Sequence, residues 1–245
     1  MQHDIVSRPE WLQARTSLLA KEKAAMRAYD QLAIEQRALP WVKIEDNYVF
    51  QGPSGPVSLS DLFGGRSQLF TKTFMLAPGQ TRQCVGCSLE VDHMAGLLEH
   101  LNNNDVAYAV IAPAPIGEIE AMRQRMGWRF PWVSSSGNNF VRDIELGFGL
   151  PGEPAGNNIF YKDDSGQIFH TYAAYARGCE AFLGIYRILD LMPKGRNENG
   201  PNHSLTDWAR PRTLYGTGGT VRSNGEFEPS ACACDDGARN GQVGL

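Results

Sequence analysis

Two cysteines separated by two residues are the side chains of this sequence with the clearest chemical potential. They lie in the segment Cys84-Val85-Gly86-Cys87, between an apolar strand-like run and a helix-like one. A cysteine at a helix N-terminus meets unpaired N–H groups and the positive end of the helix dipole, which favour the reactive thiolate. Because three residues advance a helix by about 300°, Cys87 returns to the same side as Cys84. The pair is therefore expected to close a disulfide or to bind one soft metal ion.

Three side chains further along the chain are candidate partners of the cysteine pair. His170 and Tyr172 lie on an expected strand and share one face if that strand alternates regularly. Facing the cysteines, they would serve as acid–base groups or hydrogen-bond donors, and His170 also as a metal ligand. Arg177 would hold Cys84 or a peroxide in its anionic form if the fold brings it near. The alternative for His170 is an ordinary half-buried strand histidine.

The remaining cysteines bear on the cellular compartment. Five cysteines are an odd and small number for a disulfide-stapled secreted fold, whereas close cysteine pairs in a cytosolic chain are typical of redox or metal groups. Cys232 and Cys234 form a second close pair. They are interpreted either as a mobile relay or metal-capturing arm, or as incidental residues of an unstructured tail. Cys179 is expected to pack as a small apolar residue.

Composition excludes several classes of protein. The chain has 245 residues, of which 42% are hydrophobic and 20% charged, so it is long and apolar enough to form a globular core. A formal net charge of −4 argues against a nucleic-acid partner, which requires a basic surface. No apolar run approaches the roughly 20 residues that span a bilayer, and the N-terminus lacks a signal-peptide pattern. We therefore expect a cytoplasmic protein without a membrane partner.

A long helix is predicted over residues 7–39, within an N-terminal extension of residues 1–40. Ser7 can cap this helix, Pro9 fits its first turn, and Pro40 ends it. Apolar side chains recur at roughly helical spacing, at Trp11, Leu18, Leu19, Met26 and Tyr29. The extension either docks on the domain that follows or pairs with a second copy of the chain in a homodimer.

Strand-like and helix-like segments alternate through residues 41–190, which predicts an α/β domain with a central mixed sheet, largely parallel, flanked by helices. Strands are expected near 48–50, 57–59, 67–76, 106–112, 128–134, 159–161 and 168–172, and helices over 84–101, 116–126 and 178–189. Residues 140–154 are expected to be irregular. The last two strands are predicted to form a closing antiparallel hairpin. Residues 191–245, rich in Gly, Asn, Pro and charge, are predicted to be an irregular, flexible tail.

This order of elements, with a CxxC pair at a helix start, is similar to the thioredoxin fold. More closely, the chain resembles the thioredoxin-like family known as domain of unknown function 899. The matching stretches are RPEWLQAR, EQRALPWVKIEDNYVF, GPVSLSDLFGGRSQL, CVGCS, RMGWRFPWVSS, FHTYAAYARG and ILDLMPKGR, which lie within residues 7–196. The resemblance implies a thioredoxin-like redox role. Two differences from thioredoxins stand out: Asn157-Asn158 replaces the proline expected before Ile159, and Val85-Gly86 separates the cysteines instead of Gly-Pro.

Three functional hypotheses follow. The first is a thiol–disulfide or peroxide-reducing oxidoreductase that needs no organic cofactor, in which Cys84 attacks and Cys87 resolves, acting on a small-molecule or protein thiol or disulfide. The second is a copper site formed by Cys84, Cys87 and His170, because two thiolates and an imidazole suit copper. The third is a thioredoxin-like scaffold without catalytic activity.

Overall fold

The computed structural model describes residues 3–145, 155–196, 209–222 and 226–230. The chain divides into two compact units, Met1–Val42 and Lys43–Leu245. Its helices are α1 (Arg8–Arg37), α2 (Val85–Met94), α3 (Leu98–Asn103), α4 (Ile116–Met126), α5 (Phe140–Glu145) and α6 (Gly184–Leu189). Short 3-10 helices are η1 (Asp61–Phe63), η2 (Ala176–Phe182) and η3 (Arg212–Leu214). Its strands are β1 (Val42–Lys43), β2 (Val49–Gly52), β3 (Gly55–Ser58), β4 (Gln68–Thr73), β5 (Val106–Ala112), β6 (Trp132–Ser134), β7 (Gly156–Lys162), β8 (Ile168–Tyr175), β9 (Gly219–Val221) and β10 (Phe227–Pro229).

The first unit contains the long helix α1, as the sequence predicts. Ser7 caps it through a reciprocal capping box, in which its backbone N–H donates to Glu10 Oε2 at 2.8 Å. Pro9 lies in the first turn, where its missing N–H costs nothing. No side chain of α1 is buried, and its apolar side chains include Trp11 and Met26, which are 45% and 67% exposed. Pairing of this helix with a second copy stays a prediction.

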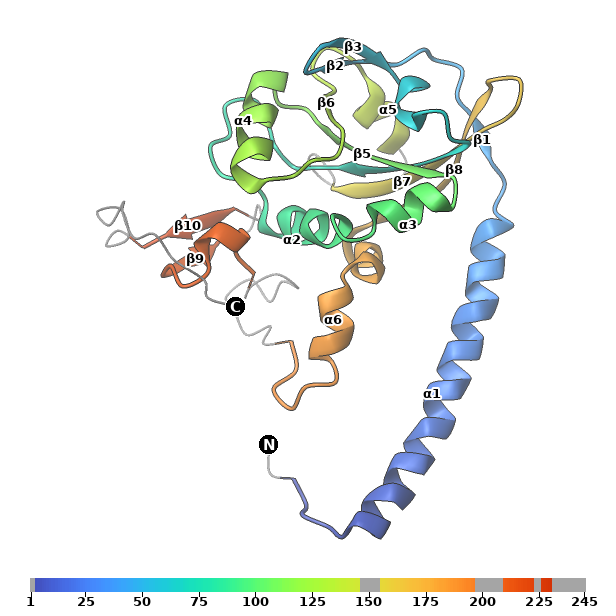
Figure 1. Ribbon diagram of the computed structural model, residues 1–245, viewed down its shortest axis with the longest axis vertical. Coiled ribbons are helices and arrows are strands. Elements are labelled where there is room, and N and C mark those ends of the chain that lie inside the picture. Colours follow the sequence, from blue (N-terminus) through green and yellow to red (C-terminus); the bar gives the residue numbers. More distant parts are fainter. Residues whose placement is uncertain (1–2, 146–154, 197–208, 223–225, 231–245) are drawn as a thin grey trace. The chain divides into compact units, whose positions relative to one another are not determined.

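An eight-stranded mixed sheet has the order β1-β8-β7-β4-β5-β6-β2-β3 (Figure 1), and its strands β2 to β8 lie in the second unit. Strand β5 lies parallel to β4 and to β6, whereas the β4–β7, β7–β8, β2–β3 and β2–β6 pairs are antiparallel. The core order β8-β7-β4-β5, with two parallel strands followed by an antiparallel hairpin, is that of the thioredoxin fold. A mixed sheet is therefore confirmed, but the expectation that it is largely parallel is wrong, because the hairpin pairs with the central strand β4.

Alternation along β4 divides the core between the two faces of the sheet. Phe70 and Phe74 point toward α2, while Leu69 points toward the opposite face. The α2 face carries a cluster that we call the cysteine-side cluster, which includes Cys84, Cys87, Val91, Met94, Tyr108, Met122, Trp128, Phe130 and Trp132. The other face carries the opposite cluster, which includes Phe50, Phe63, Leu69, Phe140, Phe160 and Ile168. Figure 1 shows α2 and α3 on one side of the sheet and α5 on the other.

Several predicted elements are broken or extended in the structure. The helix expected over residues 84–101 is two helices, α2 and α3, because the intervening Ala95-Gly96 segment has poor helix propensity at Gly96. The last predicted helix likewise divides into η2 and α6. Part of the segment expected to be irregular forms helix α5. The hairpins at β2–β3 and β7–β8, strand β5 and helix α4 are confirmed.

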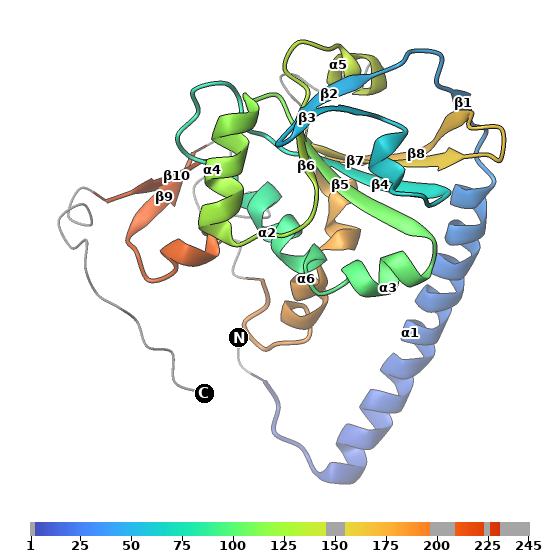
Figure 2. The ribbon, with the colours of Figure 1, turned by 45° about the horizontal axis from the view of Figure 1, so that its top comes forward.

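The C-terminal region contains a hairpin that sequence patterning did not predict. Strands β9 and β10 pair antiparallel in a separate two-stranded sheet, which is drawn to the left of α4 in Figure 2. Val221 and Phe227 of this hairpin are buried in a third cluster with Val85, Leu89, Leu183, Tyr186 and Ala209. Cys232 and Cys234 lie outside the described residues. Within the described part of the chain, no helix is long and apolar enough to cross a membrane.

Candidate functional site

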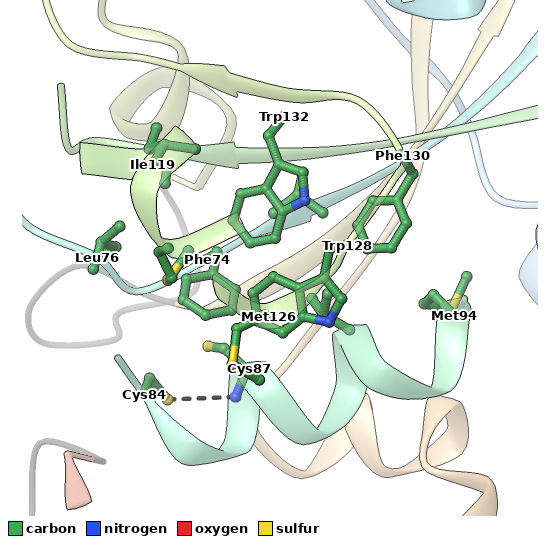
Figure 3. Packing of buried hydrophobic residues seen from close by; sticks show 14 of the residues in the cluster. Phe74, Leu76, Cys84, Cys87, Met94, Ile119, Met126, Trp128, Phe130 and Trp132 are labelled. Carbon is green, nitrogen blue, oxygen red and sulfur yellow. Dashed lines mark hydrogen bonds between the residues drawn. The ribbon is translucent and has the colours of Figure 1, made fainter. Parts of the chain in front are cut away.

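The cysteine pair lies at the start of helix α2, after the loop that follows strand β4, as predicted. Cys84 is the N-cap residue of α2, with extended backbone angles, and its Sγ accepts a hydrogen bond from the Cys87 N–H at 3.4 Å. Both thiols are free, and the residues are only 6% and 2% exposed. Figure 3 shows them at the base of a group of aromatic side chains. The thiols therefore lie together in an apolar setting, with backbone N–H donors directed at Cys84.

The two thiols have opposite acidities. Hydrogen bonding from the Cys87 thiol, followed by backbone N–H donors and the charge of Lys72, outweighs burial and lowers the pKa of Cys84 to about 7. The same thiol–thiol contact, together with burial, raises the pKa of Cys87 well above its usual value. A proton shared between the two sulfurs thus stays on Cys87. Of the two thiols, Cys84 is therefore the one that ionises more readily near neutral pH.

A buried ion pair lies behind the cysteines. Lys72 of β4 and Glu90 of α2 are joined by a hydrogen-bonded contact of 2.7 Å between Nζ and Oε2, with side-chain exposures of 2% and 4%. Burial opposes the charge on Lys72, but Glu90 and the thiols Cys87 and Cys179 outweigh it, and the pKa of Lys72 is raised. Lys72 therefore remains a cation inside the core. Its positive charge favours the thiolate form of both cysteines of the pair.

Further polar groups are buried around this ion pair. The hydroxyl of Tyr108 and both amide atoms of Asn157 have no hydrogen-bond partner within the described residues, and neither does Glu90 Oε1. Burial, followed by the negative charge of Glu90 and the proximity of Cys87, raises the pKa of Tyr108 well above its usual value. Cys179 donates to the Ala174 carbonyl at 3.3 Å, and burial raises its pKa to about 11. Cys179 is therefore a protonated, buried thiol, in line with the packing role predicted for it.

Aromatic rings enclose the other side of the cysteine pair. Trp128 and Trp132 stack with their ring centroids 5.2 Å apart and their planes 10° from parallel. Phe74 contacts Trp132 edge-on at 5.1 Å. The Trp128 indole donates to Asp92 at 2.8 Å, which fixes the orientation of the stack. These rings keep water away from Cys87, whose neutral thiol is favoured by such surroundings.

His170 is not brought to the cysteine pair. A β-bulge interrupts the β7–β8 ladder, so that Ile159 pairs with Tyr172 and Phe160 pairs with His170, leaving Thr171 between them. Paired residues share a face, so the bulge directs His170 and Tyr172 to opposite sides of the sheet. His170 stacks on Phe160 of the opposite cluster with centroids 5.0 Å apart. Burial lowers its pKa, and its Nε2 has no hydrogen-bond partner in the described structure.

The other predicted site residues have mixed outcomes. Tyr172 pairs with Ile159, which packs against the cysteine-side cluster, so Tyr172 belongs to the same sheet face as the cysteines. Arg177 lies in η2, and its side chain is outside the described part of the structure. The described residues contain no group of three or more His, Cys, Asp or Glu side chains placed to hold a metal ion. The three-ligand set of Cys84, Cys87 and His170 is therefore not assembled.

The C-terminal hairpin reaches Cys84. Cys84 forms an isolated antiparallel bridge with Glu226, and Phe227 packs against Val85 at the start of α2. Gln80 strengthens this contact, since its Nε2 donates to Glu226 Oε1 at 2.7 Å. The hairpin therefore accounts for part of the low exposure of Cys84.

Sequence reasoning missed Lys72 and Glu90. Two signals for them exist: a single lysine in the apolar run of residues 69–76, and a glutamate three residues after Cys87 on the helix face that turns inward. A charged side chain in a buried strand requires a partner of opposite charge. The helix that covers the strand is the first place to look for that partner.

Comparison with known proteins locates the chain among protein families. The sequence model described as a bacterial protein of unknown function (DUF899) matches residues 1–215. No curated protein matches the chain.

Solved structures with a similar backbone are distant in sequence. A cysteine-to-serine mutant of PrxQ from Xylella fastidiosa is 13% identical, with a TM-score of 0.43, and the match covers 60% of this chain and 94% of that one. Peroxidoxin BcpB from Mycobacterium tuberculosis is 16% identical, with a TM-score of 0.40, covering 60% and 98%. A thiol:disulfide interchange protein from Bacteroides sp. is 12% identical, with a TM-score of 0.41, covering 66% and 97%. The fold assignment rests on the strand order and directions described above.

Proposed function

This chain belongs to the DUF899 family of bacterial proteins, and on that premise we propose that it is a dithiol oxidoreductase. The observation that carries the proposal is the pairing of the two thiols at the start of α2. There the pKa of Cys84 is lowered to about 7 while that of Cys87 is raised. A nucleophile and a protonated resolving thiol are the two groups that such a reaction requires.

The proposed reaction reduces a substrate disulfide by two electrons. The Cys84 thiolate attacks one substrate sulfur, the substrate S–S bond breaks, and the leaving sulfur departs as a thiolate that takes up a proton from solvent. Cys87 then loses its proton and attacks the Cys84 sulfur. The Cys84–Cys87 disulfide forms and the second substrate thiol leaves, so the protein dithiol is oxidised as the substrate is reduced.

A hydroperoxide fits the same pair of thiols. Cys84 attacks the terminal oxygen, the O–O bond breaks, and the alcohol leaves after protonation, which converts Cys84 to a sulfenic acid. Cys87 condenses with the sulfenic acid, releasing water and forming the same disulfide. Lys72 is a positioning residue in both reactions, since its buried charge favours the thiolate without touching the substrate.

Single-cysteine variants test the proposal. We expect Cys84→Ser to abolish reduction of a reporter disulfide and of tert-butyl hydroperoxide. We expect Cys87→Ser to accumulate a mixed disulfide on Cys84, detected by intact mass. Cys179→Ser, which removes a buried thiol outside the pair, is the matched control and should retain turnover. Full turnover by Cys84→Ser would refute the proposal, and the relative rates with the two oxidants would identify the substrate class.

A further inference from the structure

Two cavities meet beside the residue that precedes the nucleophile. One, of about 230 Å³, lies between the loop leading into α2, η3 and strand β10. The other, of about 430 Å³, lies between the same loop and helix α4. Thr81, Gln83 and Arg125 line both cavities. Gln83 is directly bonded to Cys84, so both cavities adjoin the backbone of the candidate nucleophile, although the 6% exposed Cys84 is not itself among their lining residues.

The smaller cavity combines positive charge with an apolar wall. Its charged lining residues are Arg82 and Arg125, and the described residues that line it include no carboxylate. Its apolar wall consists of Pro211, Leu214, Phe227 and Pro229. A cavity of this composition suits a compact apolar body that carries a negative group.

The two arginines differ in how far neighbouring carboxylates already occupy them. Arg125 Nη2 donates to Gln83 Oε1 at 2.9 Å, and no acidic partner of Arg125 occurs among the described residues. Arg82 Nη1 forms a longer ion pair with Glu228 Oε1, at 3.6 Å. Glu228 also receives two hydrogen bonds, of 2.7 and 2.6 Å, from Arg222. The guanidinium of Arg125 is thus available for a carboxylate, which arginine binds with paired N–H donors.

Hydrogen bonds connect Arg125 to the segment that contains Cys84. Gln83 is 5% exposed, and its Nε2 donates to Ser88 Oγ at 3.0 Å, while Ser88 Oγ donates to the Cys84 carbonyl at 2.8 Å. This chain of hydrogen bonds connects the Arg125 guanidinium to the first turn of α2. Arg125 is an exposed residue, but this hydrogen bond to the buried Gln83 holds its guanidinium at a defined place relative to the start of α2.

We propose that this cavity recognises the carboxylate of a small organic substrate, and that Arg125 selects anionic over neutral disulfides or hydroperoxides for reaction at Cys84. The proposal rests on the proposed function, because it assigns the substrate class of the same site. The C-terminal hairpin supplies Phe227 and Pro229 to the cavity, so the hairpin is part of the substrate site.

Two aromatic disulfides that differ in charge test the proposal on the full reduced chain at pH 7. The anionic probe is 5,5′-dithiobis(2-nitrobenzoate) and the neutral probe is 2,2′-dithiodipyridine. We expect Arg125→Gln to lower the rate constant with the anionic probe by about tenfold, as for the loss of one charge-assisted contact, and to leave the neutral probe within about twofold. The matched control is Arg129→Gln, an exposed arginine that lines neither cavity, and it should change neither rate.

An unchanged ratio of the two rates in Arg125→Gln would overturn the proposal. An equal loss in Arg129→Gln would also overturn it, because the preference would then reflect overall charge. Binding of 4-fluorobenzoate against 4-fluorobenzamide to the Cys84→Ser protein, followed by fluorine NMR, separates this proposal from the redox reaction. Selective benzoate binding that is lost in Arg125→Gln supports the cavity even if Cys84 proves inactive. Equal binding of both probes refutes the cavity even if Cys84 is active.

Discussion

Replacing Lys72 by methionine tests the physical reasoning about the site most directly. Methionine has a similar length and no charge, so the substitution leaves the Glu90 carboxylate buried without the cation that it contacts at 2.7 Å. Breaking a buried ion pair from one side costs about 3–5 kcal/mol of unfolding free energy. Because the two side chains are only 2% and 4% exposed, we expect a loss of unfolding free energy near the upper end of that range.

The double variant Lys72→Met/Glu90→Leu separates charge from packing. Replacing both partners by apolar groups of similar volume is often neutral or stabilising. We therefore expect the double variant to recover most of the stability that Lys72→Met loses. Urea unfolding of the wild type, both single variants and the double variant gives the coupling energy directly.

The same variants carry a chemical readout. Lys72 is one of the groups that hold the pKa of Cys84 at about 7. Removing its positive charge disfavours the thiolate, so the pKa of Cys84 should rise in Lys72→Met and in the double variant. The pH profile of iodoacetamide alkylation should have its midpoint near pH 7 in the wild type and at higher pH in the variants.

The reasoning would be refuted by a Lys72→Met protein that loses less than about 1 kcal/mol, since that result would mean the pair is solvated. It would also be refuted by an unchanged alkylation profile in the well-folded double variant. In that case the backbone donors and Cys87 alone would account for the acidity of Cys84.

Three further substitutions have expected outcomes. His170→Ala should cost about 1 kcal/mol in urea unfolding, through the lost ring stacking, and leave Cys84 alkylation unchanged, because His170 lies on the opposite sheet face; slower alkylation would contradict that placement. Phe227→Ala should accelerate Cys84 alkylation by loosening the hairpin, while protection as strong as in wild type would mean that the hairpin does not cover the thiol. Gly156→Ala should lower the unfolding free energy by about 1–3 kcal/mol, because the Cβ of the alanine would collide with the Tyr175 ring. An unchanged urea midpoint would exclude that close contact.

Local patterns in the sequence were enough to predict the core of the fold and the position of the cysteine pair. Helix α4 begins after Pro115 and ends before Gly127, whose positive φ of 68° suits glycine. Both residues are helix-boundary signals that the sequence itself shows. Strand β5 is a continuous apolar run, typical of a strand buried on both faces. The cysteine pair could be located because a strand-to-helix transition has its own local signals.

The features that sequence reasoning missed depend on contacts between distant segments. The bulge at Thr171 shifts His170 by one residue relative to a regular ladder, and a shift of one residue reverses the face of a side chain. The Lys72–Glu90 pair joins a strand to a helix, and nothing in either segment alone specifies the partner. Strand β10 is three residues long and is ordered by its packing on α2, so it has no periodic pattern to detect.

The tryptophan stack should report the oxidation state of the cysteine pair through its fluorescence. Trp128 and Trp132 are nearly parallel, 5.2 Å apart, and belong to the same buried cluster as Cys84 and Cys87. Nearby disulfides quench indole emission more strongly than thiols do, and two stacked indoles in a rigid core give a pronounced near-ultraviolet dichroism. Oxidation and reduction of the pair should therefore change the intrinsic fluorescence of the unlabelled protein, so that both changes could be followed in real time without a coupled enzyme.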